Sequence, residues 1–308
     1  MALRDFFHTG LDVSRSQLTS LKNSLGPAYR LYVRKGGGVA SPVADIYEGG
    51  SDNNDGLSWE TAFATVAKAI TVANAYINWS ASPWATGIEI HVAPGVYAEN
   101  LTSLPHGASL IGWGDAWDSD GQRGVTIKPA SGSAVNVDSF VNGSIVNINF
   151  EAADASRVFD STILNQVQIL HCRFAGPPEA TTALAGIYTS DSVMLTVRDC
   201  RIEYVDCGID FVYVDAGDSM TRCLIDGNYM TYMSEAGVRI SLNLVTPASR
   251  ICNNYIGGGG QTLAIGVDNN VATPIVHVEN NIISATDGIE GYTTGTYVAG
   301  NYVNGVLE

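Results

Sequence analysis

The apolar positions beyond about residue 80 fall in short alternating segments that are separated by Gly, Asn and Asp. A six-residue pattern recurs among them, with an apolar residue at each end and turn-forming residues in the middle. It begins at Ile169, Val197, Leu224, Ile251, Val278 and Val298. Second strands that begin with Gly-Ile or Gly-Val lie between the copies, at Gly186, Gly208, Gly237, Gly266 and Gly288. The repeated segments are as long as strands, and a helical solenoid would need segments as long as helices. The repeat therefore predicts an all-β solenoid.

A parallel β-helix fits this repeat, with one coil for each copy. Equivalent residues then stack about 4.8 Å apart, so inward apolar residues and fixed turn residues both form ladders. At one turn position the successive copies hold Cys172, Cys200, Gly227, Asn254, Asn281 and Asn301. We therefore expect an asparagine ladder there, together with buried stacked thiols rather than a redox pair.

A helix is predicted over residues 62–78, ahead of the first clear coil. Its apolar positions are spaced by three and four residues, at Phe63, Val66, Ile70, Ala73 and Ile77. Ser58 is the expected N-cap. The open edge of a solenoid invites aggregation, so we expect the apolar face of this helix to cover the N-terminal end of the coils.

The stretch GGSDNNDG that precedes the helix is rich in oxygen ligands, as a calcium loop would be. When Gly56 is placed sixth, the first and twelfth positions of an EF-hand loop fall on Ser51 and Ala62. Calcium coordination needs Asp and Glu at those positions. The stretch therefore predicts a turn that leads into the helix, and we expect no metal and no cofactor.

The charge is distributed unevenly between the N-terminal segment and the rest. Residues 1–35 hold six basic and two acidic residues, whereas the whole chain has a formal net charge of −15. Residues 29–34 alternate like a strand, and residues 35–42 resemble a Gly-rich linker. We predict two parts: a basic N-terminal arm at 1–44, and the helix with the parallel β-helix at 45–308. An acidic body argues against a nucleic-acid partner, and no apolar run is long enough to predict membrane insertion.

A family resemblance rests on YEGGSDNNDGLSWETAFATVAKAI and on IEIHVAPGVYAENL that follows it. These motifs resemble the start of parallel β-helix proteins of the pectin-lyase-like superfamily, over residues 46–308. The resemblance implies a right-handed, single-stranded parallel β-helix with an N-terminal capping α-helix. It does not fix the function, since the superfamily includes lyases, hydrolases, epimerases, adhesins and phage spikes.

Catalytic residues are hard to assign, because the motifs of the polygalacturonase-like and pectate-lyase-like enzymes are absent. The candidates are three carboxylates, Asp206, Asp210 and Asp215, and Arg239 as a base, with Arg198, Arg201 and Arg222 as further arginines. Clustered carboxylates raise one pKa, as a general acid requires. The structural alternative is that these Asp residues form turns and that the arginines are salt-bridged.

Three functions follow from these observations. The first is a virion structural protein of a bacteriophage, such as a tail spike, fibre or capsid-decorating protein. It would be a homotrimer, attached to another virion protein through residues 1–35 and contacting cell-surface polysaccharide. The second is a polysaccharide lyase or glycoside hydrolase that acts on the outer face. The third is a non-catalytic carbohydrate-binding adhesin that uses aromatic residues such as Trp113, Trp117, Tyr188 and Tyr213. For Trp113 and Trp117 the alternative is a large loop packed on the coil.

Overall fold

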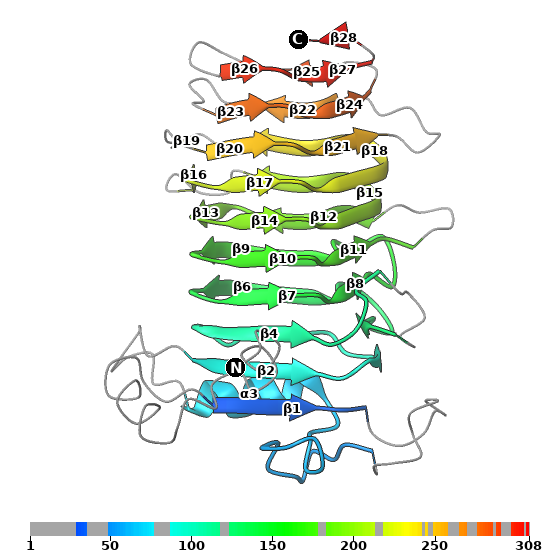
Figure 1. Cartoon of the computed structure of the whole chain (residues 1–308), viewed down its shortest axis with the longest axis vertical. Coiled ribbons are helices and arrows are strands. Elements are labelled where there is room, and N and C mark those ends of the chain that lie inside the picture. Colours follow the sequence, from blue (N-terminus) through cyan, green and yellow to red (C-terminus); the bar gives the residue numbers. More distant parts are fainter. Residues whose placement is uncertain are drawn as a thin grey trace, which may run out of the picture.

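The structure is a computed structural model, and it describes most of the chain between residues 29 and 307. The described ranges are 29–35, 49–76, 87–117, 123–177, 183–212, 218–241, 244–245, 249–257, 265–269, 276–285, 288–290, 297–304 and 306–307. Within them the chain forms an all-β parallel β-helix, in which successive coils stack into an elongated column (Figure 1). No helix in these ranges is long and apolar enough to cross a membrane.

One side of the column is a ten-stranded parallel sheet. Its strands are β1 (Tyr29–Val33), β2 (Ile88–Val92), β4 (Ala108–Gly112), β7 (Ser144–Val146), β10 (Gln168–Leu170), β14 (Thr196–Arg198), β17 (Leu224–Asp226), β20 (Ser249–Cys252), β23 (Val276–Glu279) and β26 (Tyr297–Ala299). Each coil of the column contributes one strand in chain order, as Figure 1 shows. The sheet therefore presents a series of equivalent positions, one above another.

The remaining strands form an eighteen-stranded sheet that bends around the other sides. In the first half these are β3 (Gly95–Tyr97), β5 (Val125–Ile127), β6 (Val135–Val141), β8 (Asn149–Glu151), β9 (Phe159–Asn165), β11 (Arg173–Ala175), β12 (Ala183–Thr189), β13 (Asp191–Val193) and β15 (Arg201–Val212). The second half holds β16 (Ser219–Thr221), β18 (Tyr229–Ser241), β19 (Leu244–Val245), β21 (Tyr255–Gly257), β22 (Ile265–Asn269), β24 (Ile282–Ser284), β25 (Ile289–Glu290), β27 (Tyr302–Val303) and β28 (Val306–Leu307). Except for the antiparallel β27–β28 pair, these strands pair in parallel.

The core lies inside the column and consists of apolar ladders. In the ten-stranded sheet the inward ladder runs through Ile90, Leu110, Ile145, Ile169, Val197, Ile225, Ile251, Val278 and Val298. The predicted Gly-Ile and Gly-Val strands are also in register, through Ile187, Ile209, Val238, Val267 and Ile289. The parallel β-helix and these registers, predicted from the repeat, are confirmed except at β17, where Ile225 and not the predicted Leu224 pairs with Val197.

The predicted asparagine ladder is present and buried. Its members are Asn228, Asn254, Asn281 and Asn301. The side-chain amides of the first three each donate to the amide oxygen of the asparagine in the next coil, at 2.9 Å. Each acceptor oxygen also takes a backbone N–H, and each amide donates a second bond to a backbone carbonyl of the preceding coil. The ladder satisfies the polar groups of a buried turn in every coil that it crosses.

One register in this ladder was predicted wrongly. The pattern put Gly227 at the turn position, but β17 pairs with β14 so that Asn228 takes it. Gly227 instead has a positive φ of 68° and lies beside the Asp199 side chain. Both residues suit a turn, so the local sequence did not distinguish the two registers, whereas the buried Ile225 did.

The five cysteines are buried free thiols. Cys172 and Cys200 lie in successive coils. The backbone N–H of Cys200 donates to the side-chain oxygen of Asn228 at 3.0 Å, so Cys200 adjoins the first asparagine of the ladder. Burial, together with the neighbouring Cys172, raises the pKa of Cys200 well above its usual value. A protonated, buried thiol is a poor nucleophile, so these cysteines have a packing role.

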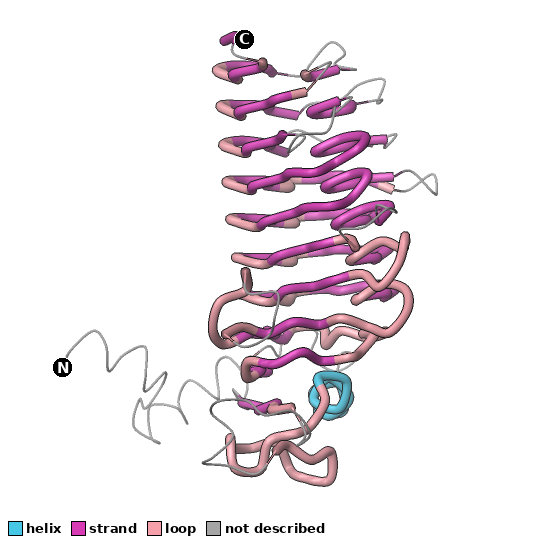
Figure 2. Tube along the Cα trace, turned by 90° about the vertical axis from the view of Figure 1, so that its right-hand side faces the viewer, coloured by secondary structure: helices cyan, strands magenta, loops and turns pink. Residues whose placement is uncertain are grey.

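Helix α3 (Val66–Tyr76) is the one helix among the described residues, and it lies beside β1 and β2 (Figure 2). It buries Val66, Ala69, Ile70 and Ala73 in the core. It begins later than predicted. Since the helix starts at Val66, Thr65 precedes it as the cap, and its hydroxyl accepts the Lys68 N–H at 3.2 Å.

Two carboxylates from outside the helix complete its N-terminus. Asp52 accepts the N–H groups of Ala64 and Thr65, at 2.9 and 3.0 Å. Glu99 accepts those of Val66 and Ala67, at 2.9 and 2.8 Å. The prediction that Ser58 is the N-cap was therefore wrong, because these carboxylates and Thr65 satisfy the free N–H groups.

The oxygen-rich stretch before the helix is a turn, and its side chains bond within the turn. Asp55 accepts the Leu57 N–H at 2.9 Å and the Thr61 hydroxyl at 2.6 Å. Asn54 donates to the Ala62 carbonyl at 3.0 Å. Among the described residues, no three His, Cys, Asp or Glu side chains come together in a group that could hold a metal ion.

The strand-like part of the predicted arm belongs to the column. β1 pairs in parallel with β2 over all of its residues, and Leu31 and Val33 are in the core. Arg30 reinforces the pairing with an ion pair to Glu89 at 3.0 Å. Residues 1–28 and 36–48 lie outside the described residues, so the division at 1–44 and 45–308 stays a prediction, with β1 on the column side.

Candidate functional site

An aromatic cluster occupies the outer face of the first coils. It combines Tyr32 of β1, His91 of β2, Trp113 immediately after β4, and Trp59 from the turn before α3. The Tyr32 and His91 rings stack at 5.6 Å because β1 and β2 place these residues in register. Trp59 meets the Tyr32 ring edge-on at 4.7 Å. The strand register therefore fixes the base on which the two tryptophans rest.

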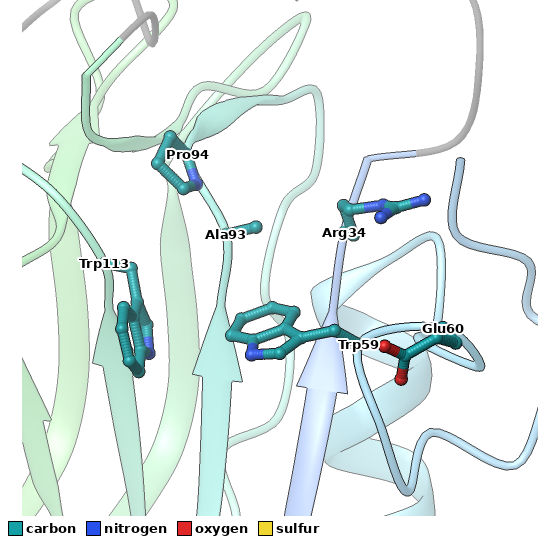
Figure 3. Close-up of a pocket in the computed structure, with 6 residues that line it drawn as sticks. All are labelled: Arg34, Trp59, Glu60, Ala93, Pro94 and Trp113. Carbon is teal, nitrogen blue, oxygen red and sulfur yellow. The ribbon is translucent and has the colours of Figure 1, made fainter. Parts of the chain in front are cut away.

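Trp59 and Trp113 form two walls of an open cleft of about 260 Å³. Their ring centroids are 5.8 Å apart and their planes are nearly perpendicular, at 89°. Figure 3 shows Ala93 and Pro94 beside the two indoles, and Arg34 and Glu60 on the Trp59 side. Trp113 is 44 % exposed. An apolar cleft with a few charged groups at its edge is the usual composition of a small-molecule binding site.

A hydrogen-bonded chain holds Trp113 in place. Its indole N–H donates to His91 Nδ1 at 3.0 Å, and His91 Nε2 lies 3.0 Å from a Glu89 oxygen. Because an indole is only a donor, Nδ1 must accept, so the His91 proton is on Nε2 and points to Glu89. The hydrogen bond from His91, with a further one from Arg30, lowers the pKa of Glu89 despite partial burial. The cleft is thus preorganised by groups on β1 and β2.

The charged edge of the cleft includes Glu60. Hydrogen bonds from its own backbone N–H and from Ser58 lower the pKa of this carboxyl, which is exposed to solvent. Glu60 is therefore a carboxylate at neutral pH, and it lines the cleft with the Arg34 guanidinium. A hydrogen-bond acceptor and a donor of this kind suit a polyhydroxylated ligand.

Arg239 and Asp210, two of the predicted catalytic candidates, come together as an ion pair. Arg239 donates from Nε and Nη2 to the two Asp210 oxygens, at 2.9 and 2.7 Å, and from Nη1 to Glu235 at 2.6 Å. The hydrogen bond to Asp210 raises the pKa of Arg239 further. Since catalysis by a base requires loss of a proton, this arginine is suited to a structural role.

Three of the other catalytic candidates have partners of their own. Asp206 accepts the hydroxyl of Ser234 from the neighbouring strand. Asp215 lies outside the described residues. Arg198 pairs with Asp226 at 3.2 Å, and Arg201 pairs with Glu203 at 2.7 Å. The salt-bridged alternative therefore describes these arginines.

The sequence pattern does not predict a charged network that lies on the eighteen-stranded sheet. Arg173 bridges Glu151, at 3.0 Å, and Glu203, which is 2 % exposed. Lys128 pairs with Glu151 at 2.9 Å, and Arg201 completes the other end. Burial favours a raised pKa for Glu151, but hydrogen bonds from Lys128 and Asn149 and the nearby positive charges lower it. Both glutamates are thus paired with Lys or Arg side chains, which is the arrangement of a structural network.

The predicted aromatic platform has a different composition. Trp113 is in the cleft, but its partner is Trp59, which was not among the predicted aromatic residues. Trp117 is 56 % exposed and its backbone N–H bonds Asp115 in a separate turn. Tyr188 is buried beneath the Arg157 guanidinium, and Tyr213 lies outside the described residues. No local signal joins Trp59 to Trp113, since the contact depends on how the turn before α3 folds back on β1.

Comparison with known proteins gives a family but no curated relative. A family model described as "Protein of unknown function (DUF1565)" matches residues 48–295. A search of curated proteins finds no match.

Proposed function

We propose that this chain, a member of the DUF1565 family, is a non-catalytic glycan-binding β-helix. The observation that carries the proposal is the cleft lined by Trp59 and Trp113, which contact each other edge to face, with Arg34 and Glu60 at its edge. Sugar rings present C–H faces that pack on aromatic rings, and hydroxyl groups that bond to charged side chains. The cleft offers both kinds of contact on a rigid base.

The rigidity of the cleft supports binding. Trp113 is oriented by His91 and Glu89, and Trp59 rests on Tyr32, so neither indole needs to be ordered when a ligand arrives. A preorganised site loses less conformational entropy on binding. The ion pair of Asp210 with Arg239 supports binding without catalysis, because it engages the first of the arginines considered as a base.

We further propose a setting for this activity: a structural protein of a bacteriophage virion, as a spike, fibre or decorating appendage. Support comes from the basic character of residues 1–35 and from the resemblance of the coils to phage spikes. In this proposal the β-helix is right-handed and of the pectin-lyase-like type, and α3 closes its N-terminal end. Residues 1–28 contact another virion protein, the chain is a homotrimer, and the cleft faces cell-surface polysaccharide.

Affinity electrophoresis tests the binding function. The full chain is run through gels that contain dextran, galactomannan, hydroxyethylcellulose or polygalacturonate, and Trp59→Ala and Trp113→Ala are run beside it. We expect at least one polymer to retard the native chain, and each substitution to weaken that retention about tenfold, the loss of one stacking ring. Trp117→Ala is the matched control, since it removes an exposed tryptophan from outside the cleft.

Two results would contradict the proposal. One is the absence of retardation by all four polymers, and the other is equal loss of retention in the Trp117 control. Release of new reducing ends from the retained polymer would instead favour the hydrolase alternative.

The assembly is tested by the solution mass of two versions of the chain. Light scattering compares the full chain with a version that begins at Tyr29, which keeps β1 in the sheet. We expect a trimer for the full chain. A trimer in both versions assigns association to the coils, a trimer only with residues 1–28 assigns it to the arm, and a monomer in both contradicts the homotrimer.

A further inference from the structure

A second concave surface lies on the same face of the column as the aromatic cleft. It is a groove of about 760 Å³ at the N-terminal ends of the strands of the ten-stranded sheet. Its floor contains Ser109 of β4, Ser144 of β7, Gln168 of β10 and Thr196 of β14. These strands lie one above another in Figure 1, so the groove runs across the strands and along the column.

The four floor residues are in strict register. Ser109 pairs with Ser144, Ser144 with Gln168, and Gln168 with Thr196. With about 4.8 Å between neighbouring strands, the ladder is about 14 Å long. Hydroxyl and amide groups thus repeat at a fixed interval along a straight line.

These side chains are open to a ligand. Ser144 donates its hydroxyl to Ser109 at 2.7 Å, which leaves the Ser109 proton to point elsewhere. In the described part of the chain, neither the Gln168 amide nor the Thr196 hydroxyl has a hydrogen-bond partner in the protein. Water satisfies such groups in solution, and a ligand with hydroxyl groups replaces that water at little cost.

The groove is neutral, although the protein as a whole is strongly acidic. Glu89 is the one charged side chain among the residues that line it, and it is neutralised by Arg30 at 3.0 Å. The ladder ends at Leu224, the residue that follows Thr196 in register. A groove that no Lys or Arg side chain of the described residues lines gives an anionic polymer no ion pair. Hydroxyl and amide groups instead bind uncharged polar groups.

Glu89 also connects the groove to the cleft. Its carboxylate lines the groove and holds His91, whose other ring nitrogen accepts the Trp113 indole N–H. Ser109 and Trp113 lie at opposite ends of the same short segment, β4 and the residue after it. Both surfaces therefore belong to one face, within reach of a single extended ligand.

We propose that the groove is a second binding segment for the glycan, and that it takes an extended, uncharged stretch of polysaccharide parallel to the long axis of the column. The inference rests on the proposed function and adds its substrate class, a neutral polymer of several sugar units. The cleft stacks one sugar ring, while the ladder bonds the hydroxyl groups of the units beyond it.

The test separates short from long ligands. The neutral polymer that retards the chain in the gel is cut into its disaccharide and hexasaccharide, and the affinity of each is measured by calorimetry with the full chain. We expect the hexasaccharide to bind at least tenfold more tightly. In the double variant Gln168→Ala with Thr196→Ala we expect this ratio to fall close to one, with the disaccharide affinity unchanged.

The controls distinguish the groove from the cleft. Trp113→Ala should weaken both ligands, and Thr162→Ala, an exposed threonine on β9 of the other sheet, should weaken neither. Equal affinity for the two ligands, or a ratio that survives the double variant, overturns the groove while leaving the cleft intact. Retention by polygalacturonate alone overturns the neutral-polymer assignment, and retention by no polymer overturns the groove and the proposed function together.

Discussion

Two ladders of neutral polar residues run along this column, and they differ in where their hydrogen bonds go. In the buried ladder of Asn228, Asn254, Asn281 and Asn301, the side-chain amides bond to each other and to the backbone. In the outer ladder of Ser109, Ser144, Gln168 and Thr196, one hydroxyl pair is bonded and the remaining groups face solvent. The repeat places neutral hydrogen-bonding side chains in both ladders. Burial determines whether these side chains bond to each other or remain open to solvent.

The difference separates a structural role from a recognition role. A buried amide without partners costs the folded state free energy, so the asparagines must be satisfied by their neighbours. An exposed amide has no such requirement, and its donors and acceptors are available to a ligand. The ladders therefore predict opposite responses to substitution, in stability for the first and in binding for the second.

The largest effect is expected from Asn254→Ala. Asn254 makes four hydrogen bonds, to the Asn228 N–H and amide, the Ile225 carbonyl and the Asn281 oxygen. Its removal takes the acceptor from the buried Asn228 N–H and one of two bonds each from the Asn228 amide and the Asn281 oxygen, at about 1–3 kcal/mol for each group that is not rescued. We expect a loss of about 3–5 kcal/mol in the free energy of unfolding, measured by urea denaturation. A loss under about 1 kcal/mol would mean that the ladder is not needed for stability.

A smaller loss is expected from Arg239→Ala, which removes a charged contact between neighbouring coils. Asp210 then keeps a buried charge without its partner, since its side chain is 6 % exposed. Breaking a buried pair costs about 3–5 kcal/mol, and the partial exposure of Arg239 reduces this to about 2 kcal/mol. Arg250→Ala is the control, because its pair with Glu279 is at the surface and should cost under about 1 kcal/mol. Equal losses in the two variants would contradict the comparison.

The third prediction concerns the dependence of stability on pH. Amide side chains do not titrate, so their contribution to stability is independent of pH, whereas that of a carboxylate is not. The pKa of Glu151 lies below its ordinary value of 4.5, against the effect of burial, because Lys128, Asn149 and Arg173 favour the carboxylate. A lowered folded-state pKa contributes stability above pH 4.5 that is lost as the pH falls through the folded value. Urea denaturation at several pH values should show that Glu151→Gln is less stable than the native chain at pH 7, and that the difference shrinks below pH 4.5. A constant difference would contradict the lowered pKa.

The smallest effect is expected from Gln168→Ala, which should change the free energy of unfolding by less than about 0.5 kcal/mol. Gln168 is exposed, and its amide makes no hydrogen bond within the described part of the chain. Thermal melting alongside Asn254→Ala gives the contrast directly. A loss comparable to that of Asn254→Ala would show that the outer ladder is structural, and would remove the reason for assigning it to a ligand.

Much of the fold was predictable because coils repeat their chemistry at fixed positions. The apolar residues of the six-residue pattern and the Gly-Ile strands gave the registers of both sheets. The error at Gly227 and Asn228 arose where two turn-forming residues are adjacent, so that only packing of Ile225 against Val197 selects one register. β1 was assigned to the arm because the residues that follow it resemble a linker, although its alternating pattern was recognised.

The candidate site was less predictable, since its parts come from separate segments. Trp113 was identified as a candidate, but Trp59 lies more than fifty positions earlier, in a turn that folds onto β1. Similarly, Ser109, Ser144, Gln168 and Thr196 are ordinary residues, and their alignment appears only when strands β4, β7, β10 and β14 are in register. Sequence repeats predict the ladders that bury apolar groups more readily than those that recognise a ligand.

The in-register stacking of coils has a genetic consequence. Contacts in the asparagine ladder join residues 26, 27 and 20 positions apart. Residues that touch in the ladder are therefore separated in the gene by the length of one coil. Duplication of a coil-length segment would give the new copy matching faces above and below, while a single inserted codon within a strand would turn its side chains to the opposite face. The length of such a protein can therefore change by whole coils during evolution, and with it the length of any polymer that the outer face accommodates.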